Sequence, residues 1–172
     1  MKYPGNKTEQ KEGKSSFIFY EQGNSYFMFN KNNSLMVFES SFEIRTSHNQ
    51  GSYDKYVKFY ERQKIDDLVY KIIAPHFRDY KSKYTDDVST FEIVLYSKPD
   101  AKICELSFSF NKDAKIPLRA IEKIEKEILA LDLNFKFDEL AYEPLIKNAL
   151  WVHYPLMYSV SRMKKYLKEK NN

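Results

Sequence analysis

Apolar and polar residues alternate in the second half of the chain in the manner of two neighbouring β-strands. Phe91, Ile93 and Leu95 fall on one face of the first strand. The apolar face of the second strand is formed by Cys104, Leu106, Phe108 and Phe110. Successive side chains of a strand point to opposite faces, so each strand is expected to have one buried and one wetter face. The turn-like residues 97–101 between them predict a hairpin.

A helical repeat follows this hairpin. Pro117 suits the first turn of a helix, where its missing N–H costs nothing, and Asp113 is a candidate cap. Apolar residues then recur at helical spacing, at Leu118, Ile121, Ile124, Ile128 and Leu131. The charged residues between them are expected to cover the solvated faces of the helix; they are Glu122, Lys123, Glu125, Lys126 and Glu127. The apolar stripe is expected to lie on the apolar face of the hairpin.

The run from Leu150 to Tyr158 is predicted to be a closing strand. Its apolar face consists of Leu150, Val152, Tyr154, Leu156 and Tyr158. Pro155 cannot donate a hydrogen bond to a neighbouring strand, which places it at a sheet edge or a bulge. Hairpin, helix and closing strand together predict a ββαβ core over residues 91–158.

The first half of the chain predicts a β-meander and a helix. Two aromatic runs, 17–20 and 26–29, flank a loop that contains Gly23, as in a hairpin. Their strands are aromatic on both faces, so either both faces are covered or one is a contact surface. Whether the meander extends the core sheet or forms a separate layer is left open. Further along, residues 53–84 show helical spacing, and Pro75 should bend or end that helix.

These elements predict an α+β fold in which an antiparallel sheet is packed by two helices. A chain of 172 residues is sufficient for one domain. The predicted divisions are a disordered linker (1–15), a single α+β domain (16–160) with its meander (16–45), helix (53–84) and ββαβ core (91–158), and a basic tail (161–172).

Composition narrows the classes of function. The 28 basic residues are nearly matched by 24 acidic ones, which is not the balance of a dedicated nucleic-acid binder. A single cysteine, Cys104, allows no intrachain disulfide, and we expect it to be a small buried apolar residue. No stretch approaches the roughly 20 apolar residues that span a bilayer. The polar residues 1–14 fit either a chain whose leader or lipid anchor was removed or an ordinary frayed terminus.

Catalytic chemistry is not indicated. His48, His76 and His153 lie far apart and show no metal-ligand spacing, so a structural role is expected for each. The pair Asp66–Asp67 is expected on a solvated helix surface, and Asp86–Asp87 in a turn. Four glycines leave little material for a phosphate-binding loop. We therefore predict no catalytic, cofactor-binding or metal-binding residues and no cofactor, and assign no partner-binding residue.

The order of elements from Ile65 to Ser159 resembles the carboxy-terminal domain of TonB-type energy transducers. Residues 91–96 look like its first core strand, 99–103 like its turn and 105–108 like its second strand, and Trp151 with 154–158 looks like its closing strand. More closely, the chain resembles uncharacterised Gram-negative cell-envelope proteins built on this domain. The family's usual turn glycine is replaced by Ala101, and no Tyr-Pro motif precedes the first helix. These departures argue against a role in energy transduction.

The resemblance implies a periplasmic or envelope-associated protein that is not an enzyme. We expect it to bind a protein or peptide partner through a sheet edge or an aromatic face, with a homodimer as one form of partner. Contact with a membrane is expected only through a lost leader or lipid anchor, and the basic tail is expected to be solvated. Two alternatives stay open: a cytosolic sheet that binds RNA or single-stranded nucleic acid, and a hydrolase or isomerase with an unrecognised site.

Overall fold

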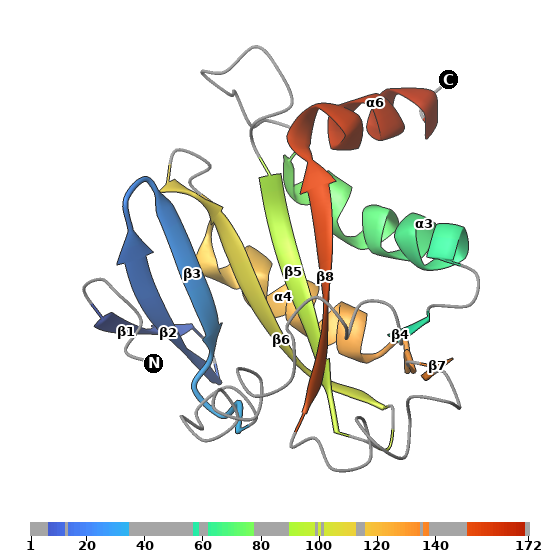
Figure 1. Ribbon diagram of the computed structural model, residues 1–172. Helices are drawn as coiled ribbons and strands as arrows, with labels where there is room; N and C mark the ends of the chain where they lie inside the picture. Colours follow the sequence, from blue (N-terminus) through green and yellow to red (C-terminus); the bar gives the residue numbers. More distant parts are fainter. Residues whose placement is uncertain are drawn as a thin grey trace.

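The computed structural model describes residues 7–12, 14–34, 57–58, 62–77, 90–98, 100, 102–112, 116–134, 136–137 and 151–170. Six strands form one antiparallel sheet in the order β1-β2-β3-β6-β5-β8 (Figure 1). Their bounds are Lys7–Glu12 (β1), Ser15–Gln22 (β2), Ser25–Asn30 (β3), Thr90–Ser97 (β5), Ile103–Asn111 (β6) and Val152–Ser159 (β8). Helices pack on this sheet, so the predicted α+β class is confirmed.

The predicted hairpin is β5–β6, and its register explains one wrong prediction. Phe91 faces Phe110 across the pair, but the register shifts between Tyr96 and Ser97. Beyond this bulge Ile103, and not Cys104, turns into the core, because an extra residue on one strand reverses the alternation. Cys104 is therefore exposed, where the sequence pattern predicted a buried residue.

The amino-terminal meander extends the core sheet, which answers the question that the sequence left open. Its two aromatic runs are β2 and β3, joined by a turn in which Gly23 has φ of +57°, a conformation that glycine adopts without strain. β3 pairs with β6, so that Tyr26 faces Phe110 and Met28 faces Phe108. The prediction of disorder over 1–15 is wrong for residues 7–12, which form the edge strand β1 on β2.

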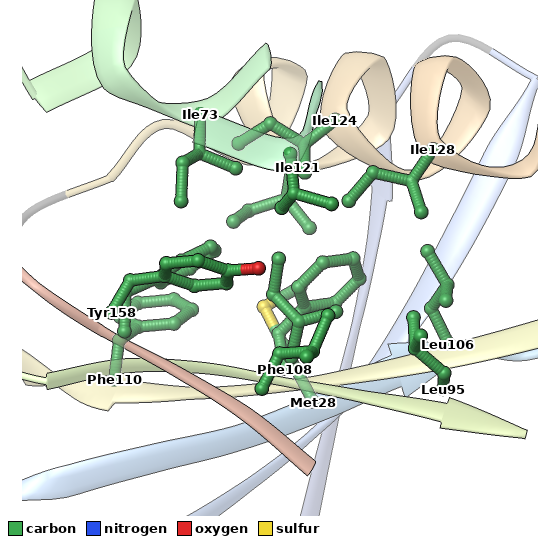
Figure 2. Packing of buried hydrophobic residues seen from close by; sticks show 14 of the residues in the cluster. Met28, Ile73, Leu95, Leu106, Phe108, Phe110, Ile121, Ile124, Ile128 and Tyr158 are labelled. Carbon is green, nitrogen blue, oxygen red and sulfur yellow. The ribbon is translucent and has the colours of Figure 1, made fainter. Parts of the chain in front are cut away.

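Three α-helices and one 3-10 helix accompany the sheet in the described part of the chain. Their bounds are Arg62–Ile73 (α3), Ala74–Phe77 (η2, the 3-10 helix), Leu118–Leu129 (α4) and Val160–Lys170 (α6). The predicted stripe of α4 is confirmed, because Ile121, Ile124 and Ile128 are buried against the apolar face of the strands (Figure 2). α4 starts directly after Pro117, as the sequence indicated.

Pro75 ends the regular part of the first helix, as predicted, since α3 stops at Ile73 and continues as a 3-10 turn. The predicted helix over 53–84 is wrong at Val57–Lys58. These two residues form the short strand β4, which pairs with Lys136–Phe137 (β7). A helical spacing of aromatic residues is a weak signal in so short a window, and cross-strand pairing overrides it.

The basic tail is also different from its prediction. Residues 160–170 form the helix α6, which packs on η2, α3 and β8. Met163 is fully buried in the main core, and Tyr166 stacks on Tyr70 of α3 with ring centroids 5.7 Å apart. Val160, Met163, Tyr166 and Leu167 follow helical spacing, but the run is short and its many charged residues favour a solvated terminus.

Several predictions fall outside the described residues: the later part of the meander (35–45), His48, Asp86–Asp87 and the Asp113 cap. In the described part of the chain, no helix combines the length and apolar character needed to cross a bilayer.

The docking of α6 can be tested by substitution. Met163→Ala should lower the free energy of unfolding by about 2–4 kcal/mol, because it leaves a cavity in the core. Lys168→Ala, at an exposed position of the same helix, should change it by less than about 0.5 kcal/mol. Urea unfolding of both variants is the measurement. Equal midpoints for the two variants would mean that the helix is a frayed tail.

Candidate binding face

The sheet has a second face, opposite the one that packs on the helices. Because core residues alternate with outward ones along every strand, the register fixes its membership. We call it the outer face; its residues on β2, β3, β5, β6 and β8 include Ile18, Tyr20, Phe27, Phe29, Glu92, Val94, Tyr96, Glu105, Ser107, Ser109, His153, Pro155 and Met157. Lys7 and Glu9 of the edge strand β1 lie opposite Tyr20 and Ile18, at the margin of this face. None of these outer-face residues belongs to the main core cluster.

Aromatic residues from the meander form the first of two clusters on this face. The ring of Tyr20 stacks on that of Phe29, with centroids 6.1 Å apart, and Phe27 lies 5.9 Å from Phe29. Ile18 and Phe29 are buried, while Tyr20 and Phe27 are only half-buried. The rings of Tyr20 and Phe27 therefore leave apolar surface accessible, next to the buried side chains of Ile18 and Phe29. This confirms that the meander is aromatic on both faces.

The second aromatic cluster lies at the other end of the face, around Tyr96. Trp151 meets the Tyr96 ring edge-on at 5.6 Å, and His153 lies 5.2 Å from Trp151. The hydroxyl of Tyr96 is 3.2 Å from the Ser107 hydroxyl, and both side chains are buried. This bond fixes the ring, because rotating it would leave a buried hydroxyl without a partner.

A carboxylate with fixed partners lies between the two clusters. Glu105 accepts hydrogen bonds from the backbone N–H and the hydroxyl of Ser34, at 2.7 and 2.9 Å. The side-chain amide of Asn33 donates a hydrogen bond to the backbone oxygen of Leu106 at 2.7 Å. The residues that follow β3 therefore stay beside β6. Glu92 is half-buried on the same face, and burial raises the pKa of its carboxyl.

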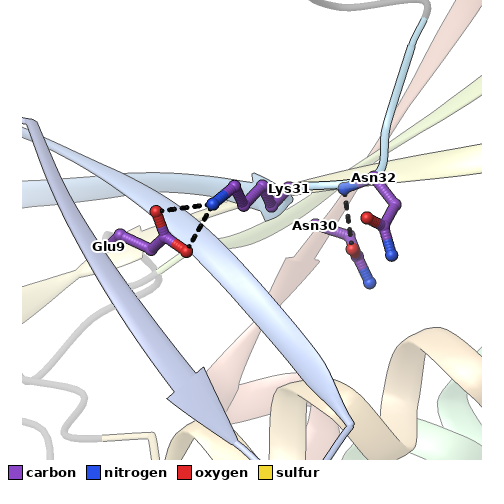
Figure 3. Close-up of polar contacts among 4 residues, drawn as sticks. All are labelled: Glu9, Asn30, Lys31 and Asn32. Atoms are coloured by element: carbon purple, nitrogen blue, oxygen red, sulfur yellow. Dashed lines mark hydrogen bonds and ion pairs between the residues drawn. The ribbon is translucent and has the colours of Figure 1, made fainter.

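Both terminal strands of the described sheet carry features that discourage the addition of another strand. In β1 the residues Lys7 to Gln10 are exposed and polar, and Glu9 pairs with Lys31 at 2.9 Å (Figure 3). β8 is more apolar, but Pro155 interrupts it and lacks the N–H that a partner strand would need. Met157 of β8 is 71% exposed, on the outer face. The face is therefore a better contact surface than either edge.

Two carboxylates that were expected on the solvated side of α4 are instead buried, and this prediction is wrong. Glu122 accepts from the Ser15 hydroxyl at 2.9 Å and from Lys126 at 2.8 Å. Glu125 accepts from the side-chain amide of Asn30 at 2.9 Å. Their spacing of three residues, each directly after an apolar isoleucine, is the signal that could have placed them together beside the buried stripe.

The two carboxylates differ in their electrostatics. Hydrogen bonds from Lys126 and Ser15 hold the pKa of Glu122 below its ordinary value. Burial raises the pKa of Glu125, and the hydrogen bond from Asn30 opposes this only in part. Opposite shifts in neighbouring carboxyls are what an acid–base pair needs. Here, however, each carboxylate accepts a hydrogen bond from a side chain of β2 or β3, and these bonds hold the helix to the sheet.

The two histidines within the described residues, His76 and His153, lie in different parts of the fold. His76 lies in η2, beside the helices, where burial and the nearby Lys123 lower its pKa. His153 lies on the outer face. Within the described residues, no three His, Cys, Asp or Glu side chains are arranged to hold a metal ion. Partial desolvation of the Cys104 thiol and the nearby charge of Glu105 raise its pKa, which makes it a poor nucleophile at neutral pH.

Glu125 and Glu122 hold α4 to the meander, and replacing each of them by glutamine should change the free energy of unfolding in opposite directions. Glu125→Gln keeps an acceptor for Asn30 and removes a charge that is costly to bury. The raised pKa of Glu125 means that the wild type loses stability as the pH rises from about 4.5. The variant should therefore gain stability relative to the wild type between pH 4.5 and 8.

Glu122→Gln is the matched control. The lowered pKa of Glu122 contributes stability above pH 4.5, so this variant should be less stable than the wild type at pH 7, and the difference should shrink in acid. Urea unfolding at several pH values measures both. Parallel pH profiles for the two variants would contradict the assignment.

The fold has a relative among solved structures, although neither a protein-family model nor a curated protein matches the chain. The chain is similar to a DUF5043 family protein from Bacteroides uniformis, whose crystal structure was determined at 1.85 Å resolution. The TM-score is 0.63 at 16% sequence identity, and the match covers 89% of this chain and 90% of the other. At this identity the likeness establishes a shared fold over nearly the whole of both chains, and function is a separate matter.

Proposed function

We propose that the protein is a non-enzymatic binding protein of the cell envelope whose partner is a protein or peptide held on the outer face. The observation that carries this proposal is the accessible aromatic area at one end of that face, where the half-buried rings of Tyr20 and Phe27 lie against the buried ring of Phe29. Tyrosine, tryptophan and methionine are enriched at protein interfaces, and the two aromatic residues bury a large area at small entropic cost. Met157, exposed on the same face, extends this surface to the sheet edge.

The polar groups of the outer face support a protein partner over a nucleic acid. Glu92 and Glu105 lie among its aromatic residues, and their charges would repel phosphates. Sheets that bind RNA place basic residues beside the aromatic rings on which bases stack, and here Lys7 lies opposite Tyr20 at the β1 edge. Nucleic-acid binding by a cytosolic protein is therefore the second candidate.

The structural role of the two buried carboxylates supports the proposal that the protein is not an enzyme. Glu122 and Glu125 hold α4 to β2 and β3, and their oxygen atoms accept bonds from those strands. The envelope location and the TonB-type relationship are supported by the order β5, β6, α4, β8, which follows the ββαβ order that the resemblance implies. A signal peptide or lipid-attachment motif encoded upstream of the chain, with recovery in the envelope fraction, is the expected outcome; recovery in the cytosol would refute the location.

Partner binding can be tested by photocrosslinking in the cells that encode the protein. A photoreactive phenylalanine analogue placed at position 157 or 20, both on the outer face, should yield one discrete crosslinked protein band. The same analogue at exposed position 123, on α4, is the control and should not yield that band. A crosslink to a second copy of the chain would identify the partner as a homodimer.

Two outcomes would overturn the proposal. The first is a product that disappears on nuclease treatment, which would favour the nucleic-acid alternative. The second is the same set of products from position 123 as from the outer face. Once a partner is identified, Met157→Ala should weaken its binding by about tenfold, as for a contact residue that costs more than 1 kcal/mol on truncation. Lys123→Ala should leave the affinity unchanged.

A further inference from the structure

The net positive charge of the chain is concentrated on one helix. The chain has 28 basic and 24 acidic residues, a net charge of +4. The eleven residues of α6, VSRMKKYLKEK, contain five of the basic residues and one of the acidic ones. The other 23 basic and 23 acidic residues cancel, so the charge of this helix alone equals the net charge of the whole chain.

The packing of α6 turns this charge into a fixed stripe. Met163 is buried in the core, and Tyr166 and Leu167 pack against it, which orients the helix. The side chains on the opposite side are exposed: Ser161, Arg162, Lys165, Lys168 and Glu169. These positions span about 120° of the helix surface at 100° per residue, so they share one side.

The cations of this stripe are available to a partner. Glu169 pairs with Lys165 at 3.8 Å, a distance at which two exposed charges attract weakly. Arg162 and Lys168 make no ion pair with any part of the described chain. Arg162 and Lys168 therefore give the exposed side of the helix a positive electrostatic potential, which attracts an anionic surface.

We propose that the exposed stripe of α6 docks the protein on a membrane surface rich in anionic phospholipid. The apolar side of the helix is taken up by the core, so the contact is adsorption on the headgroups and not insertion among acyl chains. Lysine is a compact charge on a flexible stem and needs no fixed geometry in its partner, which suits a fluid layer of headgroups. Each basic residue near such a surface strengthens binding by about fivefold.

A phospholipid surface fits this stripe better than a nucleic acid does. Proteins that bind single-stranded nucleic acid combine cations with aromatic rings on which bases stack, whereas the neighbours of Arg162, Lys165 and Lys168 on the exposed side are a serine and a glutamate. The membrane contact needs neither a leader nor a lipid anchor. It is also independent of the outer face, because α6 lies on the helical side of the sheet (Figure 1).

Sedimentation with lipid vesicles tests the proposal. The full chain should bind vesicles that contain 30% phosphatidylglycerol in phosphatidylcholine at low salt, and should not bind pure phosphatidylcholine. The triple variant Arg162→Ala, Lys165→Ala, Lys168→Ala should lose about a hundredfold in partition coefficient, at about fivefold for each cation. Binding of the wild type should also fall steeply with added salt, because surface charges are screened.

A second triple variant, Lys14→Ala, Lys98→Ala, Lys123→Ala, is the matched control. It removes the same charge from exposed positions on other elements and should retain binding within about threefold. Circular dichroism and thermal unfolding will show that both variants are folded. Equal losses in the two variants, no binding by the wild type, or tighter binding to a 20-nucleotide RNA than to the vesicles at equal salt would each overturn the proposal.

Discussion

The alternation of side chains along β5 is the constraint on which the rest of the structure depends. This strand is paired on both sides, with β6 and β8. On its inner face Phe91, Ile93 and Leu95 lie opposite apolar residues of both neighbours, and the three helices close over them. A shift of one residue in this register would turn every one of these side chains toward the outer face. The core therefore fixes the outer face at the same time as it closes the inner one.

The bulge at Tyr96 and Ser97 shows how local this constraint is. Up to Tyr96 the alternation holds, and the ring of that residue lies on the outer face with its hydroxyl bonded to Ser107. One residue later the pairing register between β5 and β6 shifts, so Ile103 is buried and Cys104 is exposed. Bulges of this kind redirect single side chains without disturbing the sheet, and they are common next to binding surfaces.

The sequence predicted the elements whose pattern is strongly periodic. The β5–β6 hairpin, α4, the edge position of β8 and the end of α3 near Pro75 are all found in the structure. Each of these has an apolar period of two or of about 3.6, or a proline whose effect on the backbone is local. The fold class followed from them, because a hairpin, a helix and a closing strand need one another to bury their apolar faces.

The features that the sequence did not predict have a common physical cause. The identity of a polar residue does not show which tertiary contact it will make. β1 contains no apolar residue, so only its pairing with β2 makes it a strand. Glu122 and Glu125 resemble any charged pair on a helix surface until β2 and β3 bring Ser15 and Asn30 beneath them. α6 resembles a solvated tail until Met163 enters the core. In each case tertiary contacts supply the information.

The same cause limits what sequence reasoning says of the candidate binding face. Its members are distributed over five strands, and only the register β2-β3-β6-β5-β8 brings them onto one surface. Phe27 and Met157, for example, are 130 residues apart in the chain, and neither carries a motif. A catalytic site can often be recognised in the sequence by a short motif, because its chemistry requires a fixed spacing of residues. A binding face requires only shape, apolar area and complementary charge, so it becomes visible after the sheet is assembled and not before.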